Sequence, residues 1–285
     1  MAPPKSIVLA RTVVSSALVL VLVTLSVLVV RWFMHDRDAS GFRAVGVGTS
    51  GLREYVHERT GILFVRVPGG SFWQGSDDRD AEPQERPRRQ STVSSFLIAK
   101  TEVTNREFRC VMGYLPSERL EVWNQYPDLD RLPVGYVSWE EAAEFCRRVE
   151  LSLPSESQWE YACRAGTDTR FAYGNDLTEQ EANFGGANVA GVSTGTRLSP
   201  IPAGSLAPNA FGLFDMHGNV AEWCFEQVEP NGEQFAESPG ARWSVLRGGA
   251  WTESARYSVH YRRDVEPRTH ALAGYGFRPV FNLSD

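Results

Sequence analysis

Thiols and imidazoles are the first side chains to consider for metal binding or catalysis. The chain has four cysteines and five histidines among 285 residues. No two cysteines form a C-x-x-C pair and no histidines form an H-E-x-x-H motif, so these patterns give no sign of zinc or dithiol chemistry. A Gly-x-Ser-x-Gly match centred on Ser193 lacks the preceding apolar strand and the following helix that a hydrolase nucleophile requires. We therefore assign no nucleophile from these residues.

Composition limits the class of protein and of partner. Hydrophobic residues make up 42% of the chain and charged residues 22%, which is typical of a folded domain and excludes a disordered polymer. The net charge is −6. Because nucleic acid favours basic surfaces, we expect no nucleic-acid partner. The mixed charges between Asp77 and Arg89 indicate a solvated loop, with the gripping of a partner peptide as the alternative.

Three short helices are indicated by their start signals. A hydroxyl residue followed three positions later by Glu or Gln can satisfy two backbone donors at a helix N-terminus. This pattern occurs at Thr104/Glu107, Ser138/Glu141 and Ser155/Gln158. The apolar residues that follow the second and third boxes recur with helical spacing and include Cys146 and Cys163, which we expect to be buried.

Short apolar runs between turn-forming residues predict strands. They are Ile62–Val67, Val93–Ala99 and Trp243–Leu246. Together with the short helices and the many glycines, they predict an α+β fold with much irregular structure. No internal repeat is visible, so residues 55–285 are expected to form a single domain.

An apolar segment precedes this domain. Residues 12–30 carry no charge, and a helix of that length would reach about 28 Å, one bilayer core. We predict a short tail (1–11), a transmembrane anchor (12–34) and a linker (35–54). The alternative is a cleaved signal peptide, whose apolar region is usually only ~7 to 15 residues. The expected location is a single-pass membrane protein with a periplasmic or extracellular body.

Seven phrases in the body together resemble the formylglycine-generating enzyme, or sulfatase-modifying factor, family. They are VPGGSF (67–72), AKTEVTN (99–105), VSWEEA (137–142), LPSESQWEYA (153–162), PNAFGLFDMHGNVAEW (208–223), LRGGAW (246–251) and GFR (276–278). The resemblance implies a single compact domain related to C-type-lectin-like folds.

The resemblance also implies the position of an active site, and at two residues of that site this chain differs from the family. Members that oxidise a cysteine to formylglycine hold copper(I), a soft ion, with two cysteines. The corresponding residues here are Glu253 and Ser258, and no cysteine follows Cys224. No copper is therefore expected. Glu253 could act as a general base or be an ordinary loop residue. His260, with Ser258, completes the candidate catalytic set.

Residues near this segment are candidates for contact with a ligand or an ion. Trp251, Arg262 and Arg263 are the candidate substrate-binding residues. By resemblance, Asn219 and Glu222 would bind a structural calcium ion, and Asn183 would belong to a second calcium site. Hard oxygen ligands suit calcium. The alternative is a turn asparagine beside a hydrogen-bonded glutamate.

The four cysteines leave one question open. Cys146 and Cys163 match positions where some exported relatives carry paired cysteines, but the partner positions hold no cysteine here. They are either free thiols or paired with each other.

Three functions are compatible with this reading. The first is a membrane-anchored, extracytoplasmic protein that has lost formylglycine chemistry and acts as a protein- or peptide-binding or assembly module. The second is a modifying enzyme, of oxidoreductase or other type, that acts on an exported protein or peptide through Glu253. The third is a hypervariable ligand-binding protein, which the absence of Asn between Trp251 and Gly276 disfavours.

Overall fold

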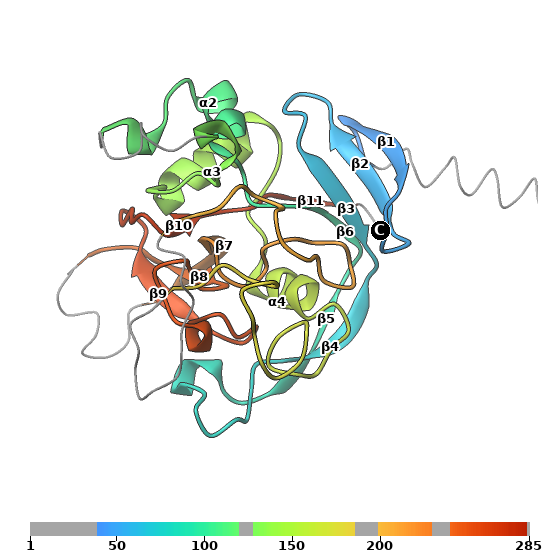
Figure 1. Cartoon of the computed structure of the whole chain (residues 1–285), viewed down its shortest axis with the longest axis vertical. Helices are drawn as coiled ribbons and strands as arrows, with labels where there is room; N and C mark the ends of the chain where they lie inside the picture. The colour runs from blue at the N-terminus through green and yellow to red at the C-terminus, as the bar shows by residue number, and fades with distance from the viewer. Residues whose placement is uncertain (1–38, 120–127, 186–198, 230–239, 284–285) are drawn as a thin grey trace, which may run out of the picture. The chain divides into compact units, whose positions relative to one another are not determined.

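Five antiparallel strands drawn from widely separated parts of the chain form the main sheet. The computed structural model describes residues 39–119, 128–185, 199–229 and 240–283. In the sheet, the strand order is β1-β2-β3-β6-β11 (Figure 1). The bounds are β1 Phe42–Val47, β2 Arg53–His57, β3 Leu63–Val67, β6 Phe96–Ala99 and β11 Val280–Asn282.

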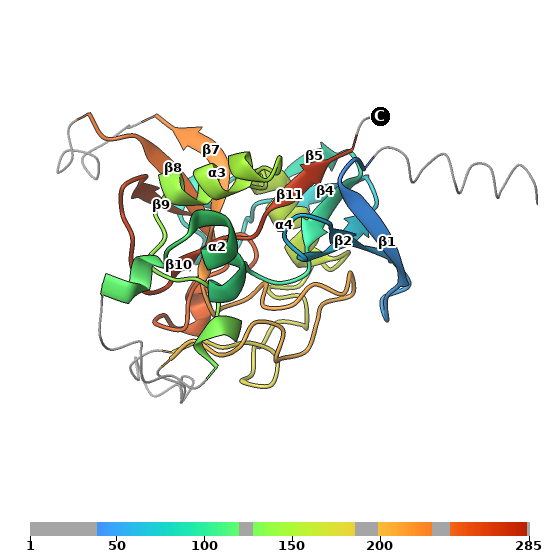
Figure 2. The same cartoon turned by 90° about the horizontal axis from the view of Figure 1, so that it is seen from above.

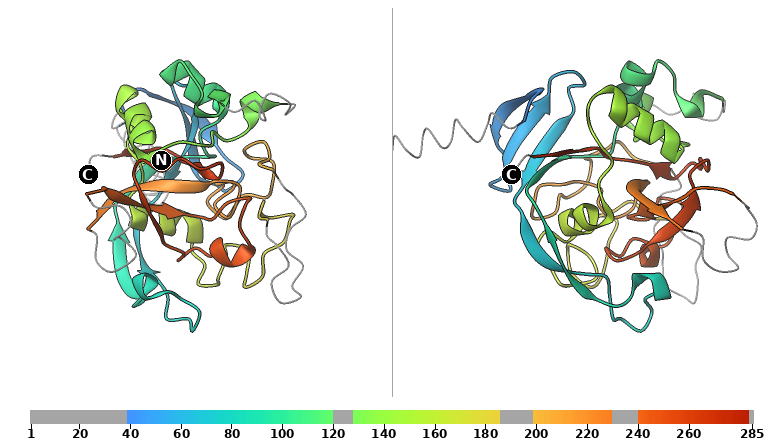
Figure 3. Two further views of the ribbon diagram at one scale, coloured as in Figure 1. Left: turned by 90° about the vertical axis from the view of Figure 1, so that its left-hand side faces the viewer. Right: turned by 180° about the vertical axis from the view of Figure 1, so that it is seen from behind.

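A second sheet and a hairpin complete the β structure. The second sheet has the order β10-β7-β8-β9, with β7 Ala221–Val228, β8 Trp243–Arg247, β9 Asp264–Pro267 and β10 Tyr275–Gly276. The hairpin joins β4 (Gly70–Gln74) to β5 (Arg89–Val93). The long connection between its strands lies beside the segment that follows β8, as the view from behind shows (Figure 3).

All three predicted helices are present and begin at the predicted residues. They are α2 (Asn105–Met112), α3 (Trp139–Arg148) and α4 (Glu156–Arg164). Each has its complete capping box; in α4, the Gln158 backbone N donates to Ser155 Oγ at 3.1 Å and the Ser155 backbone N donates to Gln158 Oε1 at 3.0 Å. Helices α2 and α3 pack against each other (Figure 2).

Helix α4 has a central position. It contacts β4 and β5 on one side and β7 and β8 on the other. The reason lies in its sequence, since Trp159, Ala162 and Cys163 form one fully buried stripe of the hydrophobic core. Its polar residues Glu160 and Arg164 consequently contact Gly75, which follows β4, and Glu160 also contacts Arg247 of β8.

Two expectations about the β structure need correction. Strand β1 lies within residues 35–54, which we assigned to a linker; it is nearly all exposed and pairs with β2, so it has no buried apolar face to reveal it. The run Val93–Ala99 is not one strand, because the chain leaves β5 at Val93 and begins β6 at Phe96.

The described cysteines are all free. Cys146, Cys163 and Cys224 are buried and Cys110 is exposed. Cys146 and Cys163 are therefore not paired with each other.

The predicted membrane anchor lies outside the described residues, as does Ser193. Within the described part of the chain, no helix is long and apolar enough to span a bilayer.

Candidate functional site

Helix α4 contributes a buried pair of opposite charges to the interior. Glu160 Oε1 accepts from Arg164 Nη2 at 2.7 Å, and both side chains are almost fully buried. Glu160 Oε2 accepts from Arg247 Nη2 of β8 at 2.8 Å. The backbone N of Gly75, just after β4, donates to Glu160 Oε1 at 2.8 Å. One carboxylate thus connects the helix, the second sheet and the hairpin.

Arg247 also fixes the segment that follows β8. Its Nη1 donates to the carbonyl oxygens of His260 and Arg262, at 3.1 Å and 2.8 Å. The next residue, Arg263, makes a double contact with Glu156 through Nε (2.8 Å) and Nη2 (2.9 Å). The backbone of 260–263 is therefore held by the buried Arg247 and by the partly buried Arg263–Glu156 pair rather than by a regular strand.

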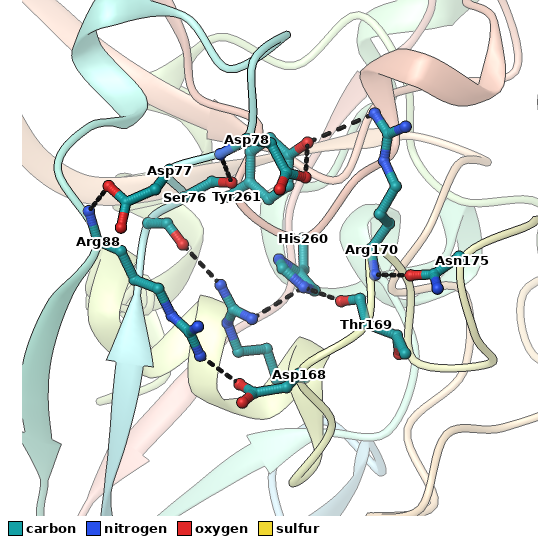
Figure 4. A pocket seen from close by; sticks show the side chains of 12 residues that line it. Ser76, Asp77, Asp78, Arg88, Asp168, Thr169, Arg170, Asn175, His260 and Tyr261 are labelled. Carbon is teal, nitrogen blue, oxygen red and sulfur yellow. Dashed lines mark hydrogen bonds and ion pairs between the residues drawn. The ribbon is translucent and has the colours of Figure 1, made fainter.

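A cavity opens between this segment and the loop that follows β4. Its volume is about 170 Å³, and Arg164 and His260 are among the residues that line it. Figure 4 shows His260 among the side chains of this cavity. Asp77 and Asp78 stand on the loop side, and Asp168 lies beyond the end of α4. We call this space, lined by these five residues among others, the charged cavity.

Two further cavities share its walls. On the other side of Gly75 and Tyr261, a space of about 150 Å³ is lined by Glu156, Arg247 and Arg263, among others. A groove of about 280 Å³ is lined by Phe72, Trp73, Tyr161 and Phe211, and it shares Arg164 and Asp168 with the charged cavity. We call this second space the aromatic groove.

Among the predicted catalytic residues, His260 is the one that lines the charged cavity. Only 2% of the residue is exposed, and its Nε2 contacts Arg164 Nη1 at 2.9 Å and the carbonyl oxygen of Thr169. Burial, and next the charge of Arg164, hold the pKa of His260 well below its ordinary value, so the ring is neutral. Its Nδ1 is buried and has no partner in the described structure.

The two predicted arginines line neighbouring cavities that Glu253 does not line, although the charge of Arg262 acts to lower the pKa of Glu253. Arg263 lines the 150 Å³ cavity. Arg262 lines a separate space of about 270 Å³, where it pairs with Asp264 at 2.5 Å and Glu85 at 3.4 Å. The loop between Asp77 and Arg89, predicted to be solvated, is partly packed, since Glu85 is buried against this segment.

Ser258 and Glu253 do not meet His260 in one pocket. The side chain of Ser258 is fully buried and its Oγ has no hydrogen-bond partner. Its carbonyl oxygen accepts from Nδ1 of His217 at 2.6 Å. A short 3₁₀ turn, η7 (Ala255–Tyr257), separates Ser258 from Glu253, and Glu253 lines none of the four cavities described above.

Glu253 has an unusual environment of its own. Its Oε2 accepts from the backbone N of Ala250 at 3.1 Å. Burial, followed by the nearby charge of Asp264, raises the pKa of Glu253 to about 7. The neighbouring Trp251 is half-buried, and its backbone N donates to the carbonyl of Asn219. A carboxyl with this pKa can exchange a proton near neutral pH.

The predicted calcium ligands are engaged in other contacts. Glu222 is fully buried, and both its oxygens lie 2.7 Å from nitrogens of Arg278, with Trp159 Nε1 at the same distance from Oε2. This carboxylate, neutralised by a guanidinium, does not fit a cation site. Asn219 has a positive φ of 61° and Glu222 is hydrogen-bonded, which matches the alternative of a turn asparagine beside a hydrogen-bonded glutamate. Asn183 Nδ2 donates to Asn219 Oδ1 at 3.1 Å. Calcium binding at Asn183 and Asn219 stays a prediction.

Several residues of the site escaped the sequence analysis. Glu160 and Arg164 stand four positions apart, which signals a helical ion pair but not its burial. Tyr261, which borders three of the cavities, carried no motif of its own. Asp77 and Asp78 were noted only as members of a charged loop.

Comparison with known proteins gives a consistent result. The family model "Sulfatase-modifying factor enzyme 1-like domain" matches residues 54–283. The formylglycine-generating enzyme of Streptomyces coelicolor is 37% identical over 75% of this chain and 87% of its own length. The "Inactive C-alpha-formylglycine-generating enzyme 2" of Bos taurus is 27% identical, over 73% of this chain and 82% of its own. The structure of PvdO from Pseudomonas aeruginosa superposes with a TM-score of 0.62 at 21% identity, covering 86% of this chain and all of that one.

Proposed function

Because this chain belongs to the family of the sulfatase-modifying factor enzyme 1-like domain, we propose that it is a non-catalytic member that binds an exported protein or peptide. We further propose that residues 12–30 anchor it in a membrane. Its body would then lie in the periplasm or outside the cell.

The observation that carries the first proposal is the chemistry of residues 253 and 258. A copper(I) site needs soft thiolate ligands, whereas Glu253 and Ser258 offer oxygen. Ser258 is in addition fully buried, with its oxygen turned away from solvent. These residues do not fit copper(I), and no step of a reaction is assigned to it. The similarity to inactive members supports the same conclusion.

A binding role is supported by the character of the cavities. Arg164 lines the charged cavity and Arg247 lines the 150 Å³ cavity. Both guanidinium groups are hydrogen-bonded to Glu160, and Arg247 also to a backbone oxygen, so they are fixed in place before any ligand arrives. Such preorganised polar walls beside an aromatic groove are suited to recognition of a polypeptide segment.

The test uses the purified full chain in detergent. It is incubated with copper(I), oxygen and a cysteine-containing sulfatase peptide, with the Streptomyces coelicolor enzyme as positive control. We expect no aldehyde by mass spectrometry, and aldehyde formation would overturn the non-catalytic assignment. Extraction of membranes with alkaline carbonate tests the anchor: the full chain should stay in the pellet, and release into the supernatant would contradict an anchor.

A second candidate function is an enzyme in which Glu253 is the general base, favoured by its pKa of about 7. Its test is a pair of variants assayed on peptides exported by the same cell. Glu253→Gln should abolish turnover, while Glu58→Gln, which removes an exposed carboxylate, should keep it. Unchanged turnover in Glu253→Gln would refute this mechanism.

A further inference from the structure

The charged cavity has an excess of negative charge at its mouth. Three arginines line it, and each has a carboxylate partner: Arg88 pairs with Asp168 at 2.6 Å, Arg170 with Asp80, and Arg164 with Glu160, which is shared with Arg247. Together with the lining Asp77 and Asp78, five carboxylates stand against four guanidinium groups, so one negative charge is in excess.

Two further carboxylates, Asp77 and Asp78, have no ion-pair partner in the described part of the chain. Asp77 Oδ1 accepts from the backbone N of Arg88 at 3.1 Å, and Asp78 Oδ2 accepts from the hydroxyl of Tyr261 at 3.1 Å. Each therefore keeps an oxygen for a ligand.

A buried group supplies an independent sign of a missing ligand. His260 lines the cavity with 2% exposure, and its Nδ1 has no hydrogen-bond partner. Buried polar atoms in folded proteins are nearly always paired. Whichever tautomer the ring adopts, it offers one more hydrogen bond to whatever enters the cavity. Figure 4 shows the ring between Thr169 and the aspartate-bearing loop.

The size and the neighbourhood of the cavity indicate what enters. Its volume of about 170 Å³ corresponds to roughly six water molecules at about 30 Å³ each, which suits the end of one long side chain. The aromatic groove adjoins it through Arg164 and Asp168. There Trp73 is 49% exposed, unusual for so large an apolar residue.

Arg88 already shows that a cation is favourable at the boundary of the two spaces. Its guanidinium carbon lies 5.4 Å from the centroid of the Trp73 ring while its Nη2 contacts Asp168. Carboxylate on one side and an aromatic face on the other is the arrangement that attracts a guanidinium or an ammonium group.

We propose that the charged cavity and the aromatic groove together bind a peptide segment in which a basic side chain stands beside an aromatic or large aliphatic one. The basic group contacts Asp77, Asp78 and His260, and the apolar side chain packs against Trp73 and Tyr161. This assignment rests on the proposed binding function and names its ligand class.

The first experiment measures binding of the labelled full chain, in detergent, to an array of random peptides. We expect enrichment of sequences with Arg or Lys next to an aromatic or large aliphatic residue. If other sequences are enriched, this assignment is overturned while the proposed binding function stands. If no peptide binds above background, both are overturned.

The second experiment tests the residues with a defined probe, fluorescein-labelled Gly-Gly-Arg-Trp-Gly-Gly, by fluorescence anisotropy. Asp78→Asn keeps an acceptor for the Tyr261 hydroxyl and removes the charge, and should weaken binding about threefold to tenfold. Trp73→Ala should weaken it comparably, and 0.5 M salt should reduce the effect of Asp78.

The matched controls are Glu58→Gln, an exposed carboxylate that lines none of the described cavities, and the probe with Glu in place of Arg. Glu58→Gln should bind like the unaltered protein, and the Glu probe should bind at least tenfold more weakly. Equal affinity for the two probes, or equal binding by Asp78→Asn, would refute the assignment.

Discussion

Replacing Glu253 by Gln should make the protein more stable at alkaline pH and leave it nearly unchanged near pH 4.5. Burial raises the pKa of Glu253 from 4.5 to about 7 in the folded protein. Between these values the folded state holds a proton that the unfolded state has released, so stability falls as pH rises through this window. Gln retains the oxygen that accepts from Ala250 N and cannot ionise.

The size of the pKa shift of Glu253 sets the expected gain in the free energy of unfolding. A difference of 2.5 units corresponds to about 3 kcal/mol at pH 8, an upper limit because Glu253 is partly exposed. For a domain of this size, that would raise the melting temperature by roughly 6 to 12 °C. Thermal unfolding of the full chain in detergent, at pH 4.5, 6 and 8, measures the difference between variant and unaltered protein. A difference that does not grow with pH, or a variant less stable at pH 8, would refute the reasoning.

Three further perturbations test other parts of the structure. Glu160→Gln leaves two buried guanidinium groups short of a counter-charge and should cost about 3 to 5 kcal/mol of unfolding free energy in urea titrations. The control is Glu144→Gln, which removes ion pairs of a partly exposed carboxylate with Arg147 and Arg148, and equal effects would contradict the buried network. Burial lowers the pKa of His217 to about 4 in the folded protein, so the unfolded chain takes up this proton first as pH falls below 6.5. The free energy of unfolding should therefore drop by about 2 kcal/mol by pH 5. His217→Asn should flatten this dependence on pH, and an unchanged dependence would contradict the lowered pKa of His217. Gly218 and Gly166 both have a positive φ, but Gly218→Ala would place Cβ 2.2 Å from a backbone oxygen whereas Gly166→Ala meets nothing within 4 Å. Gly166→Ala should lower the free energy of unfolding by about 1 to 2 kcal/mol, and Gly218→Ala should lower it clearly more. Equal melting temperatures of the two variants would contradict the packing at Gly218.

The local part of the fold could be predicted because its signals are local. A capping box lies within four residues, so Thr104, Ser138 and Ser155 predicted the three helix starts correctly. Strand β1 could not be predicted, because its exposed residues show no alternation and only its pairing with β2 makes it a strand.

The site was harder to predict than the fold. Glu253 and His260 were both candidate catalytic residues, but His260 lines the charged cavity whereas Glu253 lines none of the four cavities described. The 3₁₀ turn at residues 255–257 separates Glu253 from His260 in the chain, and only His260 reaches the charged cavity. Glu222 illustrates a second difficulty, since its partner Arg278 lies 56 residues away and nothing in the local sequence distinguishes an ion-paired carboxylate from a metal ligand.

The pairing of β6 with β11 has a consequence for how the domain is made. Ile98 of β6 pairs with Val280 of β11, and Leu97 with Phe281. During synthesis β11 can therefore pair with β6 only after Val280 has left the ribosome. The apolar residues of β3 and β6 have been synthesised long before that point. Such long-range pairing slows folding and leaves an open apolar edge in the nascent chain. Chains interrupted before β11 should accordingly depend on chaperones or be degraded.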